Sequence, residues 1–165
     1  MRVIFLLLFF FLSLFSKTPQ SVNFVDPKLF SGTWFEIART YNYFEKNCLA
    51  PTVEYKLLDS NEFKVFNRCY DKNDTQNIIQ YEGKAVPKEK DSMSKIDMTY
   101  FLIFTSEYRI IYLNDYQTAV MASSDLENIW IMSKTKNIKK DELNKILKFL
   151  DSFMDTSKLI YSNHS

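Results

Sequence analysis

The feature of this sequence that most limits its fold is a repeated alternation of apolar and polar residues in short runs. Such runs lie between residues 33 and 133, and turn-forming residues separate them. In one run Val53, Tyr55 and Leu57 are large and apolar, whereas the residues between them are polar. Short strands with one buried face at this spacing predict an antiparallel sandwich or barrel. The predicted strands are residues 34–41, 52–58, 62–70, 78–86, 94–104, 108–113, 117–122 and 128–133. Seven or eight strands fit the pattern, and eight is the number at which a closed barrel can enclose one small ligand.

The period of the apolar residues changes after residue 137. Five apolar side chains then recur at helical spacing and predict one amphipathic helix within residues 137–155: Leu143, Ile146, Leu147, Leu150 and Met154. We expect its apolar stripe to pack on the outer wall of the barrel and its lysines, at 139, 140, 145 and 148, to face water. Contact of these lysines with a membrane surface is the alternative. Residues 158–161 can add a final short strand.

Rare residue types exclude several classes of protein. The two glycines, Gly32 and Gly83, lie far apart, so no glycine-rich loop is present to hold a nucleotide phosphate. His164 is the single histidine, which argues against histidine-based triads and most zinc or haem sites. The chain has 21 basic and 20 acidic residues, and this balance gives no basic surface for nucleic acid. We expect no nucleotide, metal or other cofactor.

The first residues resemble a signal peptide. Residues 3–15 are apolar except for Ser13, follow one arginine, and are too short for the roughly 20 residues of a membrane-spanning helix. We predict a signal peptide over residues 1–16, with 21 as the alternative end; a permanent anchor is the competing interpretation. No cysteine directly follows the apolar run, so a lipid-anchored bacterial lipoprotein is not expected. The predicted organisation is a barrel domain at 22–161 and a tail at 162–165. The protein should be exported, to the periplasm in a bacterium or to the secretory pathway in a eukaryote.

An exported protein folds in an oxidising compartment, where an even number of cysteines usually forms bridges. Cys48 and Cys69 flank two predicted strands joined by a turn at residues 59–61. An antiparallel hairpin here brings residue 51 near residue 69, so a Cys48–Cys69 disulfide is expected. A free reactive thiol is the alternative. Asn73 and Asn163 begin glycosylation sequons that matter only in a eukaryotic secretory pathway.

Three short motifs stand at the ends of predicted strands. They are Gly-Thr-Trp at 32–34, Asn-Asp-Tyr at 114–116 and Trp-Ile-Met-Ser-Lys-Thr at 130–135. In this order and spacing they resemble the lipocalin family, and Glu-Ile-Ala-Arg at 36–39 and Asn-Arg-Cys at 67–69 resemble its bacterial and apolipoprotein D branch. The resemblance implies an all-β fold: an eight-stranded antiparallel up-and-down barrel, open at one end, with the C-terminal α-helix packed outside. It also implies that the barrel holds a small hydrophobic ligand.

The resemblance assigns a structural role to the motif residues at the closed end of the barrel. Trp34 should plug this end beneath Lys134, whose cation stacks on the indole ring. Lipocalins usually have arginine at the position of Lys134, and lysine stacks less well, so this closure should be weaker. Gly32, Asp115 and Tyr116 complete the predicted closure.

With Trp34 pointing inward, the lipocalin register predicts which residues line the cavity. Glu36 would also point inward, where a buried carboxylate needs a hydrogen-bond partner or a raised pKa. A core filled entirely by side chains is the alternative to a cavity. The predicted ligand-binding residues are largely aromatic and aliphatic: Ala38, Val53, Tyr55, Val65, Asn67, Tyr81, Met98, Tyr100, Arg109, Ile111, Met121, Asn128 and Trp130.

Such a wall suits a flexible apolar chain, because methionine and aromatic side chains adapt to its shape. Arg109, on the inward register near the open end, could pair with an anionic head group; a solvated arginine on the rim is the alternative. We therefore expect a non-enzymatic carrier of fatty acids or lysophospholipids, either a monomer or a homodimer, with peripheral membrane contact left open. The alternatives are a lipocalin-like enzyme using Cys69 or Glu36, a haem or tetrapyrrole binder, and a protein-binding module.

Overall fold

The structure is a computed structural model that describes residues 19–165. The signal peptide predicted over residues 1–16 lies outside the described residues, as do residues 17 and 18 of its alternative extension to residue 21. None of the helices in the described range is long and apolar enough to cross a membrane.

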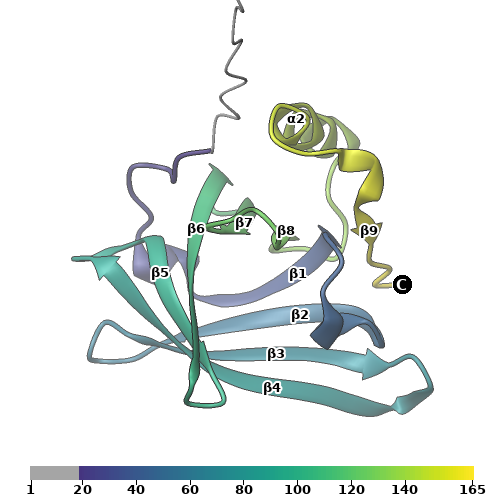
Figure 1. Cartoon of the computed structure of the whole chain (residues 1–165), viewed down its shortest axis with the longest axis horizontal. Helices are drawn as coiled ribbons and strands as arrows, with labels where there is room; N and C mark the ends of the chain where they lie inside the picture. Colours follow the sequence, from purple (N-terminus) through teal and green to yellow (C-terminus); the bar gives the residue numbers. More distant parts are fainter. Residues whose placement is uncertain (1–18) are drawn as a thin grey trace, which may run out of the picture.

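Eight antiparallel strands close into a barrel, and one helix lies outside it (Figure 1). Successive strands pair from β1 to β8, and β1 closes the barrel by pairing with both β2 and β8. The predicted fold class is therefore confirmed. The strands are β1 (Gly32–Arg39), β2 (Cys48–Leu57), β3 (Phe63–Asp71), β4 (Asp74–Glu89), β5 (Ser92–Tyr100), β6 (Phe104–Asn114), β7 (Thr118–Ser123) and β8 (Ile129–Ser133).

The strand predicted at residues 94–104 ends earlier than expected. Phe101 and Leu102 have φ angles of 52° and 64°, in the left-handed region, and the N–H of Ile103 donates to the carbonyl of Tyr100. These residues form a tight turn between β5 and β6. The turn was missed because it contains four apolar residues and no glycine, proline or asparagine.

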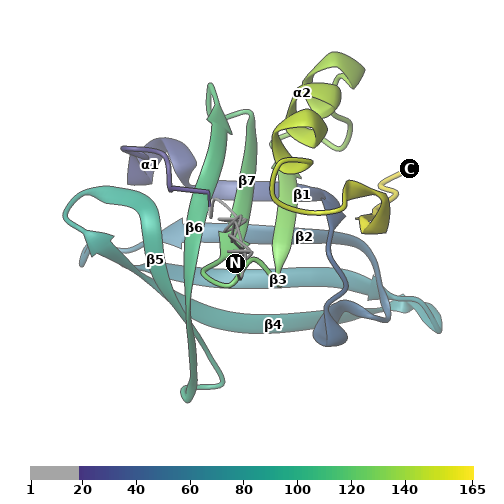
Figure 2. The same cartoon turned by 45° about the horizontal axis from the view of Figure 1, so that its top comes forward.

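Two apolar layers stabilise the barrel. The inner layer fills the closed end and includes Phe30, Trp34 and Phe63, all fully buried. The outer layer lies between the barrel wall and helix α2 (Lys140–Leu150), whose Ile146 and Leu150 are fully buried. Figure 2 shows α2 on the outside of the barrel, near β7 and β1. The helix is shorter than the predicted 137–155, and its lysines at 139, 140, 145 and 148 are exposed.

The chain ends are packed against the barrel. A short helix, α1 (Pro27–Phe30), is capped by the Asp26 side chain and lies at the closed end. After the 3₁₀ helix η2 (Thr156–Lys158), strand β9 (Ile160–Tyr161) adds to the edge of β1. The residues beyond β9 continue along β1, where the buried His164 has its Nε2 2.7 Å from the carbonyl oxygen of Glu36.

A candidate ligand cavity at the open end of the barrel

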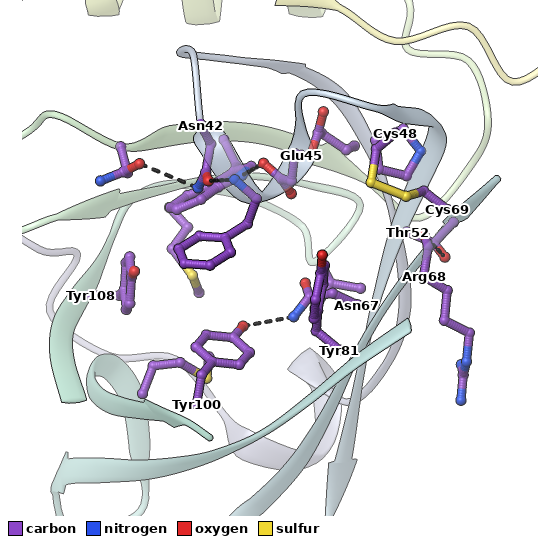
Figure 3. A pocket seen from close by; sticks show the side chains of 18 of the residues that line it. Asn42, Glu45, Cys48, Thr52, Asn67, Arg68, Cys69, Tyr81, Tyr100 and Tyr108 are labelled. Carbon is purple, nitrogen blue, oxygen red and sulfur yellow. Dashed lines mark hydrogen bonds between the residues drawn. A yellow bond between two sulfur atoms is a disulfide. The ribbon is translucent and has the colours of Figure 1, made fainter. Parts of the chain in front are cut away.

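A cavity of about 540 Å³ occupies the half of the barrel opposite α1. Strands β2 to β6 and β8 each contribute at least two lining residues to it, whereas β1 contributes Glu36 and β7 contributes Met121. Most lining side chains are aromatic or aliphatic, so the wall is largely apolar. Figure 3 shows the side chains converging on this space from opposite sides.

The floor of the cavity is formed by the closed end. The Trp34 indole is fully buried, and its Nε1 donates to the carbonyl of Phe30 at 2.8 Å. Lys134 Nζ lies 4.3 Å from the centroid of the Trp34 ring and donates to the carbonyls of Ser31 (2.6 Å) and Phe30 (3.3 Å). Partial burial lowers the pKa of Lys134 to about 8. The lysine thus binds the end of α1 and covers the tryptophan, which is the geometry that the motifs predict.

The other closure residues lie at the same end. Gly32 has a φ of 94°, and its Cα faces the Lys134 amine so closely that a Cβ would lie 3.6 Å from Nζ. Asp115 and Tyr116 form the turn between β6 and β7, both with positive φ. The Tyr116 hydroxyl accepts a hydrogen bond from the N–H of Asp26 at 2.9 Å. This contact ties the N-terminal segment to the barrel.

Aromatic side chains gather at the mouth of the cavity. Phe44, in the 3₁₀ helix η1 (Tyr43–Glu45), has its ring centroid 6.3 Å from that of Tyr81 and 6.4 Å from that of Phe101. The Tyr81 and Phe101 rings are 6.0 Å apart. Three segments far apart in the sequence thus bring one ring each to the entrance. A ligand entering the cavity must pass these rings.

The disulfide predicted between Cys48 and Cys69 is confirmed, with Cα atoms 5.3 Å apart. Both residues lie beside the mouth, where the bond joins the start of β2 to β3. The bond thereby fixes the segment that follows η1. Because Cys69 is in the disulfide, it offers no free thiol to the cavity.

Polar groups line the upper wall, and most have partners within it. Asn67 Nδ2 donates to the Tyr100 hydroxyl at 2.7 Å (Figure 3). Asn42 Nδ2 lies 3.4 Å from Asn128 Oδ1 and connects η1 to the loop between β7 and β8. Burial raises the pKa of Tyr100, so its hydroxyl keeps its proton at physiological pH.

Two buried carboxylates share one arginine beside the cavity. Arg39 donates to Glu36 at 3.0 Å, its Nη2 donates to the carbonyl of Glu45 at 2.8 Å, and its Nε lies 3.3 Å from the Glu45 carboxylate. Glu45 also accepts from the Trp130 indole at 3.2 Å. Burial, together with the neighbouring Glu45 charge, raises the pKa of Glu36 to about 8. Burial raises the pKa of Glu45 as well. One cation neutralises one of the two acids, and the other retains a proton.

The structure places nine of the thirteen predicted ligand-binding residues on the cavity wall. A tenth, Val65, points into the barrel but is fully buried in the inner apolar layer at the closed end. The nine are Val53, Tyr55, Asn67, Tyr81, Met98, Tyr100, Met121, Asn128 and Trp130.

Ala38, Arg109 and Ile111 were predicted to face inward, and this was wrong. Ala38 and Ile111 belong to the outer layer beneath α2. Arg109 lies on the outer face, where its Nε donates to Glu107 at 2.8 Å. Arg109 is therefore not placed to meet a head group in the cavity.

Two β-bulges explain these errors. The ladder shifts by one residue between Glu36 and Ala38 in β1, and again between Ile110 and Tyr112 in β6. A bulge reverses which face the following residues point to. Alternation counted from the closed end therefore fails beyond each bulge. The bulge in β1 also directs Arg39 inward, and the bulge in β6 directs Tyr108 into the cavity.

Several residues of the cavity were not predicted from the sequence. Phe44 and Glu45 lie in η1, in a segment that was left without secondary structure. Phe101 lies in the missed turn, and Tyr108 lies beyond the bulge in β6. The aromatic cluster at residues 41–44 is a signal that could have indicated a cavity rim. Among residues 19–165, no group of three or more acidic, histidine or cysteine side chains could hold a metal ion.

Comparison with known proteins agrees with this geometry. Residues 25–164 match the family described as the lipocalin-like domain. The outer membrane lipoprotein Blc of Escherichia coli K12 is 31% identical over 152 residues, which cover 88% of this chain and 85% of that protein. Apolipoprotein D of Macaca fascicularis is 25% identical over 146 residues, covering 83% and 75%. The structure of insecticyanin from Manduca sexta superposes with a TM-score of 0.73 at 23% identity, covering 89% and 85%.

A closed eight-stranded barrel with a plugged end and an apolar cavity defines the class of ligand-binding β-barrels. Within this class the chain belongs to the lipocalin family. The resemblance that the three sequence motifs suggested, including that to the bacterial and apolipoprotein D branch, is thereby confirmed.

Proposed function

We propose that this lipocalin is an extracytoplasmic, non-enzymatic carrier of a lipid with a single acyl chain. The observation that carries the proposal is the cavity of about 540 Å³, which lies above the inner apolar layer that contains Trp34 and opens between aromatic side chains. This volume is in the range of small-molecule sites, about 300–1,000 Å³. A flexible acyl chain fits a wall of methionine and aromatic residues, since such side chains adapt their shape to the ligand.

The charges around the cavity favour a lysophospholipid over a fatty acid. Among the described lining residues Arg68 alone is cationic, and it is bonded to Glu54 at 2.7 Å and directed away from the cavity (Figure 3). Arg39 is already paired with Glu36 and Glu45, so it leaves no free cation for a fatty-acid carboxylate, while the carboxyl oxygens of the two acids remain as hydrogen-bond acceptors. A lysophospholipid instead offers a hydroxyl group, and in many cases an ammonium group, that can donate to such acceptors. Its phosphate would remain at the mouth, in water.

The energetics are consistent with micromolar binding. Burying about 300–400 Å² of acyl chain at roughly 25 cal/mol per Å² gives about 8–10 kcal/mol before ordering costs. A micromolar Kd corresponds to about 8 kcal/mol, so burial of the chain sets the upper limit of affinity near the micromolar range, and contacts of the head group would offset part of those costs.

Two observations support a carrier over an enzyme. Cys69 is held in the disulfide, and Glu36 is held by Arg39 and by the Ser162 hydroxyl at 2.9 Å. Both groups line the cavity, but each already has structural partners. The extracytoplasmic location is supported by the apolar run at residues 3–15, by the disulfide, and by relatives named as outer membrane lipoproteins.

The proposal can be tested by titrating the protein with lysophosphatidylcholine and with a fatty acid of equal chain length, using Trp130 fluorescence. Trp130 lines the cavity, so a bound chain should change its emission. Val53→Phe should fill part of the cavity and weaken lysophosphatidylcholine binding at least about tenfold, as expected for lost burial of a few methylene groups. Lys56→Phe, on the outer face of the same strand, is the control and should bind normally.

Equal affinities of the two variants would contradict binding in the cavity. Tighter binding of the fatty acid than of lysophosphatidylcholine would contradict the choice of head group. Mass spectrometry of organic extracts of the purified protein should, on this proposal, detect lipids with one acyl chain.

A further inference from the structure

The turn between β5 and β6 is the most exposed apolar segment of the described chain. Its four consecutive residues, here called the apolar tip, are Phe101, Leu102, Ile103 and Phe104. Their exposed fractions are 51%, 96%, 75% and 63%. No charged residue lies between Asp97 and Glu107. The hairpin extends past β4 in the view of Figure 2, so the apolar tip projects from the barrel.

The backbone of the apolar tip is as unusual as its side chains. Phe101 and Leu102 are consecutive residues with positive φ, a conformation that glycine and asparagine adopt readily and that bulky side chains adopt at a cost. Two large apolar side chains thus occupy exposed positions where the backbone conformation is strained. Strain of this kind concentrates at functional sites.

We infer that the apolar tip inserts into the surface of a lipid bilayer and docks the mouth of the barrel on the membrane. Phe101 and Phe104 belong to the apolar tip and also line the cavity, so the inserted surface is continuous with the lipid site. In this respect the inference rests on the proposed function. A single acyl chain could move between membrane and cavity without crossing water.

The shape of the tip favours a lipid surface over a second protein. A stable protein interface buries about 800 Å² from each partner, whereas an apolar patch of four residues offers a few hundred Å². A narrow convex hairpin inserts readily between lipid head groups. Beside it, Tyr41 and Tyr43 are each 64% exposed in the segment that contains η1. Tyrosine rings with exposed hydroxyls are typical of the membrane interface.

The absence of charge on the tip determines which membrane it should bind. The exposed lysines of α2 lie on the outer wall, and Lys46, in the segment that contains η1, has its Nζ 4.0 Å from the centroid of the Tyr43 ring. Binding should therefore depend on burial of the tip and not on anionic lipids. It should occur on zwitterionic membranes and respond little to salt.

Flotation with phosphatidylcholine vesicles tests the inference on the purified protein. The wild type should float with the vesicles, and Leu102→Asn should reduce partitioning by about tenfold or more, as expected for the loss of one inserted leucine. Asparagine adopts positive φ readily, so this variant should fold. Leu29→Asn is the control, since Leu29 is 58% exposed on α1 at the closed end. It should partition like the wild type.

The inference fails if the wild type does not float, or if Leu102→Asn floats as well as the wild type. It also fails if Leu29→Asn loses partitioning equally. A large loss of partitioning between roughly 0.05 and 0.5 M salt would assign binding to the lysines and overturn it. A dimer in solution that Leu102→Asn dissociates, without vesicle binding, would show that the tip binds a second copy.

The same variants separate this inference from the proposed function. Leu102→Asn should keep the affinity for monomeric lysophosphatidylcholine measured by Trp130 fluorescence, because Leu102 does not line the cavity. Val53→Phe should lose that affinity and still float. Flotation without ligand binding by the wild type would refute the carrier and leave membrane docking standing.

Discussion

Two turns of the same backbone conformation stand at opposite ends of this barrel. At the closed end Asp115 and Tyr116 have φ angles of 46° and 54°, and at the open end Phe101 and Leu102 have φ angles of 52° and 64°. In each turn the N–H of the following residue donates to the carbonyl of the residue before the pair.

The side chains of the two turns differ in what they contact. Aspartate tolerates the left-handed conformation, and Tyr116 offsets its strain by packing on the inner layer and binding the Asp26 N–H. Leu102, in contrast, is 96% exposed and has no such contact. At the closed end the contacts of Tyr116 therefore offset the cost of its left-handed conformation. At the open end Leu102 adopts the same conformation, and no contact of its side chain offsets that cost. This difference marks the open end as the functional end.

The largest effect on stability is expected at the closed end. Trp34→Ala should lower the free energy of unfolding by about 3 to 5 kcal/mol, since it removes a fully buried indole and leaves a cavity. Trp130→Ala, which truncates a half-buried ring at the open end, should cost less. Urea unfolding of both variants measures the difference. A melting temperature of Trp34→Ala within about 2 °C of the wild type would contradict its role as the plug.

At the open end, the titration of Glu36 should make the free energy of unfolding decrease as pH rises. The pKa of Glu36 is raised from 4.5 to about 8, so the folded protein holds a proton that the unfolded chain has lost. Its stabilising contribution is complete below pH 4.5 and disappears as pH rises through 8. Between pH 5 and 8 the free energy of unfolding should fall by a few kcal/mol, the order of magnitude that the raised pKa of one buried carboxyl group implies.

Glu36→Gln removes the titrating proton while keeping an oxygen that can accept from Arg39 and Ser162. Urea unfolding at several pH values should therefore give a nearly flat profile for this variant between pH 5 and 8. Parallel profiles of the variant and the wild type would assign the pH dependence to other groups.

The closed end should respond to pH in the opposite direction. Burial lowers the pKa of Lys134 from 10.5 to about 8, so above pH 8 the unfolded chain binds a proton that the folded protein has released. The free energy of unfolding should therefore rise with pH between about 8 and 10.5. The rise should be below about 1 kcal/mol, because half of the lysine remains in solvent.

Lys134→Met should abolish this rise relative to the wild type, whereas Glu36→Gln should keep it. Chemical unfolding at pH 8 and pH 9.5 provides the measurement. The same slope in wild type and Lys134→Met would mean that the amine is solvated as in a free lysine.

The sequence predicted the closed end better than the open end, and the two bulges explain why. Trp34 and Lys134 occupy motif positions, and the strands keep simple alternation near them. Beyond the bulges in β1 and β6 the alternation changes phase, so Ala38 and Arg109 were assigned to the wrong face. A bulge depends on how two strands pair across the barrel, and one strand's pattern does not contain that information.

The sequence did not predict the residues at the mouth, and the reason there is different. Glu45 and Phe44 come from a loop whose position is fixed by long-range contacts, such as the pairing of Glu45 with Arg39 and Trp130. The Phe101–Leu102 turn lacks the residues by which turns are usually recognised. Where the sequence departs from local preference in this way, function is a reasonable explanation of the departure.

The smallest predicted effect compares the two turns directly. Leu102→Asn should raise the free energy of unfolding by about 0.5 to 1 kcal/mol, because asparagine relieves part of the cost of the left-handed conformation and Leu102 buries almost nothing. Tyr116→Asn relieves the same strain but loses the packing and the hydrogen bond to Asp26, so it should destabilise the protein. Melting temperatures of the two variants should therefore shift in opposite directions. Destabilisation by both would mean that the exposed leucine supports the fold, and the open end would then no longer differ from the closed end in the way argued above.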